Sequence, residues 1–127
     1  MTKLKGIAPI LETSNLKESI KYYETTLGFV CQGVWPETGD VCWASMRRDD
    51  AVIMLCIRNP KSKLEKPAFS GTLYLYPGDV DEAWAELKDK ANISYEIETF
   101  DYGMREFGVI DPDGYLLQFG QEVDCAD

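Results

Sequence analysis

Residues 15–29 read NLKESIKYYETTLGF, and this segment carries the signals of one short amphipathic helix. Asn15 is a helix-capping residue with a glutamate three positions further on, the spacing of a capping box. Gly28 follows the apolar positions as a residue that ends a helix. The apolar side chains recur at the spacing of one helix face, at Leu16, Ile20, Tyr23 and Leu27.

The chain repeats this helix-start signature 64 residues later, where Asp79-Val80-Asp81-Glu82 corresponds to Asn15-Leu16-Lys17-Glu18. Identities between the two halves are few, so the repeat depends on pattern more than on identical letters. It nevertheless keeps one register without a gap, which predicts a duplicated structural unit. Further matching positions are Gly39 with Gly103, Asp49 with Asp113, Ala8 with Thr72, and Met54 with Gln118.

Both halves show the same order of predicted elements. In the first half the helix lies between a strand at 4–11 and strands near 29–36, 40–47 and 51–57. In the second half a strand at 70–76 and a helix capped by Asp79 precede strands near 93–100, 105–110 and 115–121. The Asp111-Pro112-Asp113-Gly114 segment predicts a hairpin turn between the last two strands. The order is βαβββ twice, which predicts an α+β fold.

The length of 127 residues suits one domain built from two halves that share a core. We assign module one to residues 1–58, a polar linker to 59–69, module two to 70–122 and a tail to 123–127. The linker contains two prolines, three lysines and little that could be buried.

The composition excludes several classes of protein. A net charge of −9 argues against binding to nucleic acid, whose phosphates need a basic surface. An acidic surface would attract a cationic ligand, although it is also common in soluble acidic proteins of any function. No apolar run approaches the ~20 residues of a membrane span, and the N-terminus lacks the features of a signal peptide. We therefore expect a cytoplasmic protein with reduced thiols at Cys31, Cys42, Cys56 and Cys125.

The helix segment at 15–29, the Tyr102-Gly103-Met104-Arg105-Glu106-Phe107 run and the Asp111-Pro112-Asp113-Gly114 turn occur in this order within the duplication. Together they resemble the glyoxalase/bleomycin resistance/extradiol dioxygenase superfamily, the vicinal oxygen chelate proteins, over nearly the whole chain. The resemblance implies two βαβββ modules that form cupped mixed sheets. It implies little about function, because this scaffold hosts isomerases, lyases, dioxygenases and drug-binding proteins.

Enzymes of that superfamily bind a divalent metal at positions that correspond here to Ala8, Met54, Thr72 and Gln118. None of the four is a His, Asp or Glu, and the chain contains no histidine. Alanine offers no donor, a thioether is a soft ligand, and Thr and Gln are neutral and poor ligands. We therefore expect no metal and no cofactor. The departure resembles the bleomycin-resistance branch, whose members bind an aromatic, cationic drug without altering it.

Strand alternation places Thr72, Tyr74 and Tyr76 on one face, and the resemblance implies that such faces line a cup. The same side chains could instead fill the cup, and ordinary packing is an equal alternative for Trp43 and Phe107. For Arg105 we favour an ion pair with Glu106 or Asp101 over a role in ligand binding. The candidate ligand-binding residues are Trp35, Trp43, Met54, Thr72, Tyr74, Tyr76, Phe100, Tyr102, Arg105, Phe107 and Gln118.

No catalytic constellation is evident in the sequence. No Ser or Cys can have a histidine base, Cys56 is best explained as an inert buried thiol, and no pair of carboxylates stands out. We predict a homodimer that binds or sequesters a small aromatic or cationic molecule, in the manner of antibiotic-resistance proteins and without catalysis. Two alternatives remain. One is a metal-dependent lyase, isomerase or dioxygenase with unpredicted ligands, and the other is a regulatory module with a filled cup.

Overall fold

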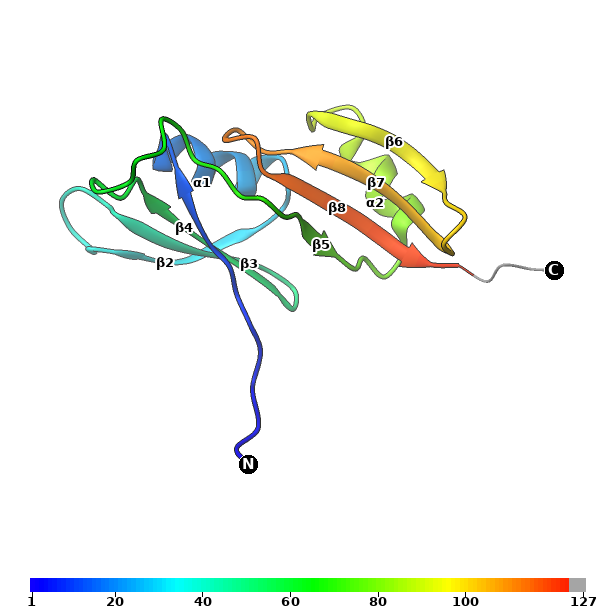
Figure 1. The fold of residues 1–127 in the computed structure, drawn as a ribbon, viewed down its shortest axis with the longest axis horizontal. Coiled ribbons are helices and arrows are strands. Elements are labelled where there is room, and N and C mark those ends of the chain that lie inside the picture. The colour runs from blue at the N-terminus through cyan, green and yellow to red at the C-terminus, as the bar shows by residue number, and fades with distance from the viewer. Residues whose placement is uncertain (124–127) are drawn as a thin grey trace. The chain divides into compact units, whose positions relative to one another are not determined.

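The computed structural model describes residues 1–123, and the chain forms two compact units with the boundary along the sequence between Pro67 and Ala68. Each unit contains one helix and one four-stranded mixed sheet (Figure 1). The predicted α+β class and the duplicated βαβββ order are confirmed. Cys125 and the rest of the predicted tail from Asp124 onward lie outside the described residues.

The first unit has the strand order β1-β4-β3-β2, with β1 parallel to β4 and the other neighbours antiparallel. Asn15 caps its helix as predicted, because the side-chain oxygen accepts a 3.2 Å hydrogen bond from the backbone N–H of Glu18. Gly28 turns the chain after the helix with a φ of 76°. The elements are β1 Ile10–Thr13, α1 Leu16–Thr25, β2 Val30–Trp35, β3 Trp43–Arg48 and β4 Ala51–Ile57.

The second unit has the corresponding order β5-β8-β7-β6, with β5 parallel to β8. Asp79 caps its helix and accepts from the N–H groups of Asp81 and Glu82. The predicted hairpin turn is present, because the Asp111 side chain accepts from the N–H of Asp113 at 2.8 Å and Gly114 has a φ of 89°. The elements are β5 Leu73–Leu75, α2 Val80–Leu87, β6 Ile93–Thr99, β7 Met104–Ile110 and β8 Leu116–Glu122.

The internal repeat is visible in the parallel strand pairs. Ile10 is paired with Met54 in the first unit, and Tyr74 is paired with Gln118 in the second. Tyr74 and Gln118 each lie 64 residues after their counterparts Ile10 and Met54. The 64-residue offset of the sequence repeat therefore relates equivalent positions in the two sheets.

Each helix covers one face of its own sheet. In the second unit, α2 contacts β7 and β8 (Figure 1), and Trp84 packs edge-on against Phe107 with ring centroids 5.2 Å apart. Val109, Leu117 and Phe119 alternate with residues of the opposite face and are also buried. We call the face away from α2 the open face of the second unit. Its positions on the two central strands include Glu106, Gly108, Gln118 and Gly120.

The edge strands β1 and β5 are shorter than predicted. β1 begins at Ile10 and not near residue 4, since Leu4 and Ile7 are exposed and the pairing with β4 starts at Ile10. Pro9 lies just before the pairing and contributes only its carbonyl oxygen, which accepts from the N–H of Met54 at 3.0 Å. β5 is limited to Leu73–Leu75, against a prediction of 70–76, because only these three residues are paired with β8.

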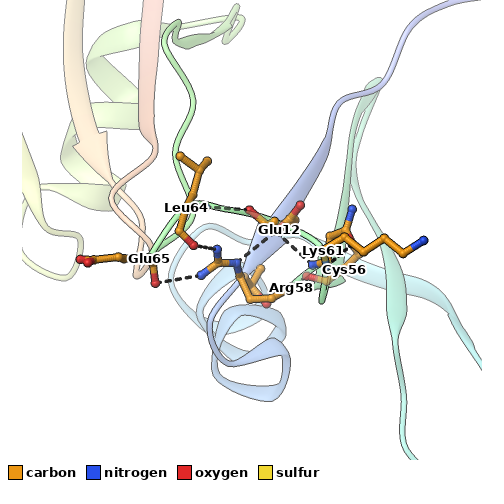
Figure 2. A network of polar contacts seen from close by, with 9 residues as sticks. Glu12, Cys56, Arg58, Lys61, Leu64 and Glu65 are labelled. Atoms are coloured by element: carbon orange, nitrogen blue, oxygen red, sulfur yellow. Dashed lines mark hydrogen bonds and ion pairs between the residues drawn. The ribbon is translucent and has the colours of Figure 1, made fainter.

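Arg58 fastens the first part of the predicted linker to unit one (Figure 2). Its Nε atom lies 3.1 Å from Oε1 of Glu12 on β1, in an ion pair that is partly exposed. Its two terminal nitrogens donate to the carbonyl oxygens of Leu64, at 2.6 Å, and Glu65, at 3.2 Å. Arg58 thus binds a segment that the sequence predicts to be a polar linker.

Neither helix of the described residues is long and apolar enough to cross a membrane. Cys31, Cys42 and Cys56 are free thiols, as predicted for these three. Burial raises the pKa of the Cys56 thiol and the Glu12 carboxylate raises it further, which keeps this cysteine in its unreactive form.

Candidate functional site

A buried glutamate lies at the centre of the open face of the second unit. Glu106 on β7 is only 1% exposed. Its Oε2 atom accepts hydrogen bonds from the Tyr95 hydroxyl at 2.8 Å and from the Gln118 amide at 3.3 Å. Its Oε1 atom accepts a hydrogen bond from the Tyr102 hydroxyl. The carboxylate is therefore an acceptor in every contact, which is the role of an ionised carboxylate.

The hydrogen bonds continue behind Glu106 to the edge strand β5. Thr72, just before β5, donates its hydroxyl to Oε1 of Gln118 at 2.6 Å, which fixes the orientation of the amide. The Gln118 amide donates to the Tyr95 hydroxyl at 2.9 Å as well as to Glu106. We call Thr72, Tyr95, Tyr102, Glu106 and Gln118 the carboxylate cluster. Its hydrogen bonds all lead towards one acceptor, Glu106.

Two glycines make room for tyrosine rings on the open face. A Cβ atom at Gly108 would overlap the ring of Tyr95, its cross-strand partner. A Cβ atom at Gly120 would overlap the hydroxyl and ring of Tyr74. Glycine in the interior of a strand commonly marks such a close approach. The two rings thus sit directly on the backbone of β7 and β8.

The hydroxyl of Tyr74 is buried and has no partner with full hydrogen-bond geometry within residues 1–123, although it lies near enough to Glu106 for a hydrogen bond to that carboxylate to help raise its pKa. Burial raises the pKa of Tyr74, and the charge of the nearby Glu106 carboxylate raises it further. The ring of Tyr74 also contacts that of Tyr76, with centroids 5.2 Å apart. An unpaired buried hydroxyl is uncommon in folded proteins, and it lies beside the carboxylate cluster.

An acidic, aromatic groove of about 550 Å³ opens next to the carboxylate cluster. Phe100 stacks on Tyr102 with centroids 5.5 Å apart and an interplanar angle of 3°, and Tyr95 meets Phe100 edge-on. None of the groove-lining residues in the described part of the chain is basic. The groove is lined by Tyr95, Glu96, Ile97, Glu98, Phe100, Tyr102 and Gln118.

The electrostatics of the site are strongly negative. Glu98 is the cross-strand partner of Glu106, and like charges in such pairs destabilise a sheet. Within residues 1–123, Glu106 has no hydrogen bond or ion pair with a Lys or Arg. The hydrogen bond to Glu106 raises the pKa of Tyr102 to about 12, and burial raises that of Tyr95. The protonated, donating form of both hydroxyls is thereby favoured.

The structure brings together several of the predicted ligand-binding residues. Thr72, Tyr102 and Gln118 belong to the carboxylate cluster, and Tyr74 and Phe100 adjoin it. Tyr76 contacts Tyr74 but is largely exposed. Three predicted ligand-binding residues lie on strands of the first unit: Trp35, Trp43 and Met54.

In the first unit, Trp35 on β2 and Trp43 on β3 are cross-strand partners. Trp35 is 65% exposed, whereas Trp43 is half-buried on the face opposite α1. Met54 on β4 lies between Ile10 and Ser45 and is also half-buried. These three residues form no part of the carboxylate cluster.

Two predicted site residues lie on the helix side of the sheet. Phe107 is fully buried and stacks on Phe119 with centroids 5.1 Å apart, so core packing is its role and no surface remains for a ligand. Arg105 forms an ion pair, as favoured, but the expected partners Glu106 and Asp101 were wrong. Its Nε atom lies 3.0 Å from Oδ1 of Asp81 on α2, because strand alternation turns Arg105 away from Glu106.

Sequence reasoning missed Glu106 and Tyr95 as site residues. The sequence indicates Glu106 only as a possible partner for Arg105, although Glu106 alternates with the core residue Phe107 on a central strand. A second signal was available in Gly108 and Gly120, which interrupt two otherwise regular strands.

The positions at which the superfamily's enzymes hold a metal do not fit a divalent ion here. The Gln118 carbonyl oxygen already accepts from Thr72, and its amide points towards Tyr95 and Glu106. Ala8 precedes β1 and has no donor atom, and Met54 offers only a thioether. Residues 1–123 contain no group of three or more His, Cys, Asp or Glu side chains that could hold a metal ion.

The chain belongs to the Glyoxalase/Bleomycin resistance protein/Dioxygenase superfamily, whose family model matches residues 7–119. No curated protein matches the sequence. The fold is similar to that of TioX from Micromonospora sp. ML1, with a TM-score of 0.75, 17% identity and coverage of 92% of this chain and 98% of TioX.

Two bleomycin-related structures are also similar. The bleomycin-binding protein of bleomycin-producing Streptomyces verticillus, solved with copper(II)-bleomycin, has a TM-score of 0.71, 23% identity and coverage of 94% and 97%. A bleomycin resistance determinant encoded on transposon Tn5 has a TM-score of 0.71, 21% identity and coverage of 94% and 98%. At these identities the similarity shows the common fold alone.

Proposed function

We propose that this protein binds a small cationic molecule with an aromatic part, without a metal and without changing the ligand chemically. The observation that carries the proposal is Glu106, a buried carboxylate that three neutral groups hold in place and that has no basic partner in residues 1–123. A buried charge is normally paired. A cationic ligand would supply the missing partner.

The surroundings of Glu106 support the same class of ligand. Tyr95, Phe100 and Tyr102 provide aromatic surface for stacking and for cation–π contact. Glu96 and Glu98 add negative charge to the groove. The volume of about 550 Å³ is within the range of small-molecule sites, which argues against a cup filled by its own side chains.

Bleomycin is the first ligand to test, because proteins of similar fold carry names that refer to it. We expect saturable binding in a calorimetric titration with metal-free bleomycin or a simple cationic aromatic, weaker at high salt, and recovery of the ligand unchanged. Glu106→Gln should weaken binding by about tenfold or more. Glu24→Gln, which removes an equal charge from an exposed position on α1, serves as the matched control.

The proposal fails if no cationic aromatic binds saturably, or if an anionic analogue of the same size binds equally well. It also fails if the two glutamate variants lose the same affinity, since general charge and not Glu106 would then be responsible.

We further propose that the protein acts as a cytoplasmic homodimer. Each sheet ends in edge strands, β1 and β2 in one unit and β5 and β6 in the other. Edge strands favour pairing with another chain, and two-fold dimers are the commonest oligomers.

A further inference from the structure

The hydrogen bonds of the carboxylate cluster leave acceptors, and not donors, available to a ligand. Gln118 uses both amide N–H groups and its carbonyl oxygen. The Tyr95 hydroxyl donates to Glu106 and accepts from Gln118. The two oxygens of a carboxylate offer about four lone-pair positions. Glu106 receives hydrogen bonds at three of them, so one position on Oε1 remains.

A second acceptor lies beside the first. The Tyr74 hydroxyl is buried and has no partner with full hydrogen-bond geometry within residues 1–123. Its O–H is near enough to Glu106 for a hydrogen bond to the carboxylate to raise the pKa of Tyr74, so the lone pairs of the hydroxyl oxygen are what it offers to a ligand. A buried polar group of this kind destabilises a protein unless something supplies its hydrogen bond. Its oxygen can accept an N–H from the same ligand group that reaches Glu106.

The carboxylate of Glu98 also favours a positively charged ligand group beside Glu106. It is the cross-strand partner of Glu106, lines the groove and contributes to the raised pKa of Tyr102. Two carboxylates in this relation repel each other, and a cation close to both reduces the repulsion.

We propose that the charged head of the ligand is a nitrogen cation with at least two N–H groups. One N–H donates a hydrogen bond to the Glu106 carboxylate, and another donates to the Tyr74 hydroxyl oxygen. Primary ammonium, amidinium and guanidinium groups meet this description, whereas quaternary ammonium groups do not. The inference rests on the proposed function and narrows it, because a quaternary cation would also satisfy the charge of Glu106 but would leave both acceptors unpaired.

Access to Glu106 passes through Tyr102. The carboxylate is 1% exposed, whereas Tyr102 is 67% exposed and lies in the turn between β6 and β7. Tyr95 is fixed on Gly108, whereas Tyr102 can turn without disturbing a strand; it then gives up its stacking on Phe100 and its hydrogen bond to Oε1, and a ligand N–H takes the place of that hydrogen bond. An N–H group can then reach Oε1 from the groove.

The test compares three probes of similar size: benzylammonium, benzyltrimethylammonium and benzyl alcohol. Amide NMR titrations of the intact protein would give their relative affinities and show whether residues of β7 and β8 respond. We expect benzylammonium to bind at least about tenfold more tightly than the other two, since a hydrogen bond to a charged group contributes that much.

Two variants test the acceptors separately. Glu106→Gln should reduce benzylammonium affinity by about tenfold or more and leave that of benzyl alcohol unchanged. Tyr74→Phe should reduce benzylammonium affinity by about threefold to tenfold while raising the melting temperature, because it removes an unpaired buried hydroxyl. Tyr22→Phe, which removes the same hydroxyl from a half-buried tyrosine on α1 of the other unit, is the control for Tyr74→Phe.

Equal or tighter binding of benzyltrimethylammonium, still dependent on Glu106, would overturn this inference and leave the proposed function standing. Equal binding of benzyl alcohol would overturn both, because the site would not recognise charge. If none of the probes binds, the inference fails, and the bleomycin titration decides the proposed function separately.

Discussion

The ring of Tyr95 occupies the space that a side chain at its cross-strand partner Gly108 would fill. The ring keeps its hydroxyl within 2.8 Å of Oε2 of Glu106 on the same strand as the glycine. The Tyr95 hydroxyl can therefore reach Glu106 only because residue 108, two positions further along β7, is a glycine.

Gly108→Ala should lower the free energy of unfolding by roughly 1–3 kcal/mol, because the new methyl group overlaps the Tyr95 ring. Chemical denaturation would measure the loss. Gly33→Ala is the matched control on β2, where a Cβ atom would meet nothing within 4 Å. An equal loss in the two variants would contradict the close packing of Tyr95 on Gly108.

Tyr102 should ionise only in strong alkali. The hydrogen bond to Glu106 raises its pKa from the ordinary 10.0 to about 12, so folding favours the protonated hydroxyl. Its contribution to stability is complete below pH 10 and is lost as the pH rises through about 12. The ultraviolet absorbance of tyrosinate, with Tyr102→Phe subtracted, would follow this titration. Glu106→Gln should return the pKa towards its ordinary value, and an unchanged titration would rule out their hydrogen bond.

Arg58→Ala should expose the linker to proteases. The change removes the ion pair with Glu12 and the donors to the carbonyls of Leu64 and Glu65. A loss of roughly 1.4 kcal/mol of local stability makes opening about tenfold more frequent, and tryptic cleavage after Lys61 and Lys63 should accelerate accordingly. Arg47→Ala, which removes an arginine bound within its own sheet, should leave these rates unchanged. Equal acceleration in both would show that Arg58 does not hold the linker.

Protein purified without a chelator should contain no stoichiometric divalent metal. Thr72 and Gln118 hydrogen-bond each other at 2.6 Å, and neither Ala8 nor Met54 offers a charged or imidazole donor. Elemental analysis provides the measurement. About one Zn, Ni, Mn or Fe per chain would favour the metal-dependent enzyme with ligands outside the expected positions.

Light scattering at micromolar concentration should give twice the chain mass of 14.4 kDa, as expected of a homodimer. A mass equal to that of one chain would contradict it. Dilution to nanomolar concentration would then show whether a measured dimer dissociates.

The local features of the fold could be read from the sequence, and the long-range ones could not. Asn15, Asp79 and the turn at 111–114 act on backbone groups within a few residues, so their signals are complete in a short segment. The start of β1 depends instead on where β4 offers a partner, more than forty residues later. Arg105 likewise has its partner, Asp81, on an element that the local sequence does not reveal.

The candidate site was predicted in part for the same reason. Parity along a strand correctly grouped Thr72 with Tyr74, and the superfamily resemblance drew attention to Gln118. The importance of Glu106 arises from three donors on other segments, which no local pattern displays. Its burial follows from the tyrosines that cover it, and these in turn depend on glycines in β7 and β8.

The hydrogen bonds from Thr72 through Gln118 and Tyr95 to Glu106 make the site preorganised. These donors point at the Glu106 carboxylate and hold it in one position, so the acceptor that a cation would meet needs little reorientation when a ligand arrives. Tyr102 has to give up its hydrogen bond to Glu106 and its stacking on Phe100, but it lies in an exposed turn and no strand has to move with it. Association should therefore be a single fast phase whose rate constant rises linearly with ligand concentration.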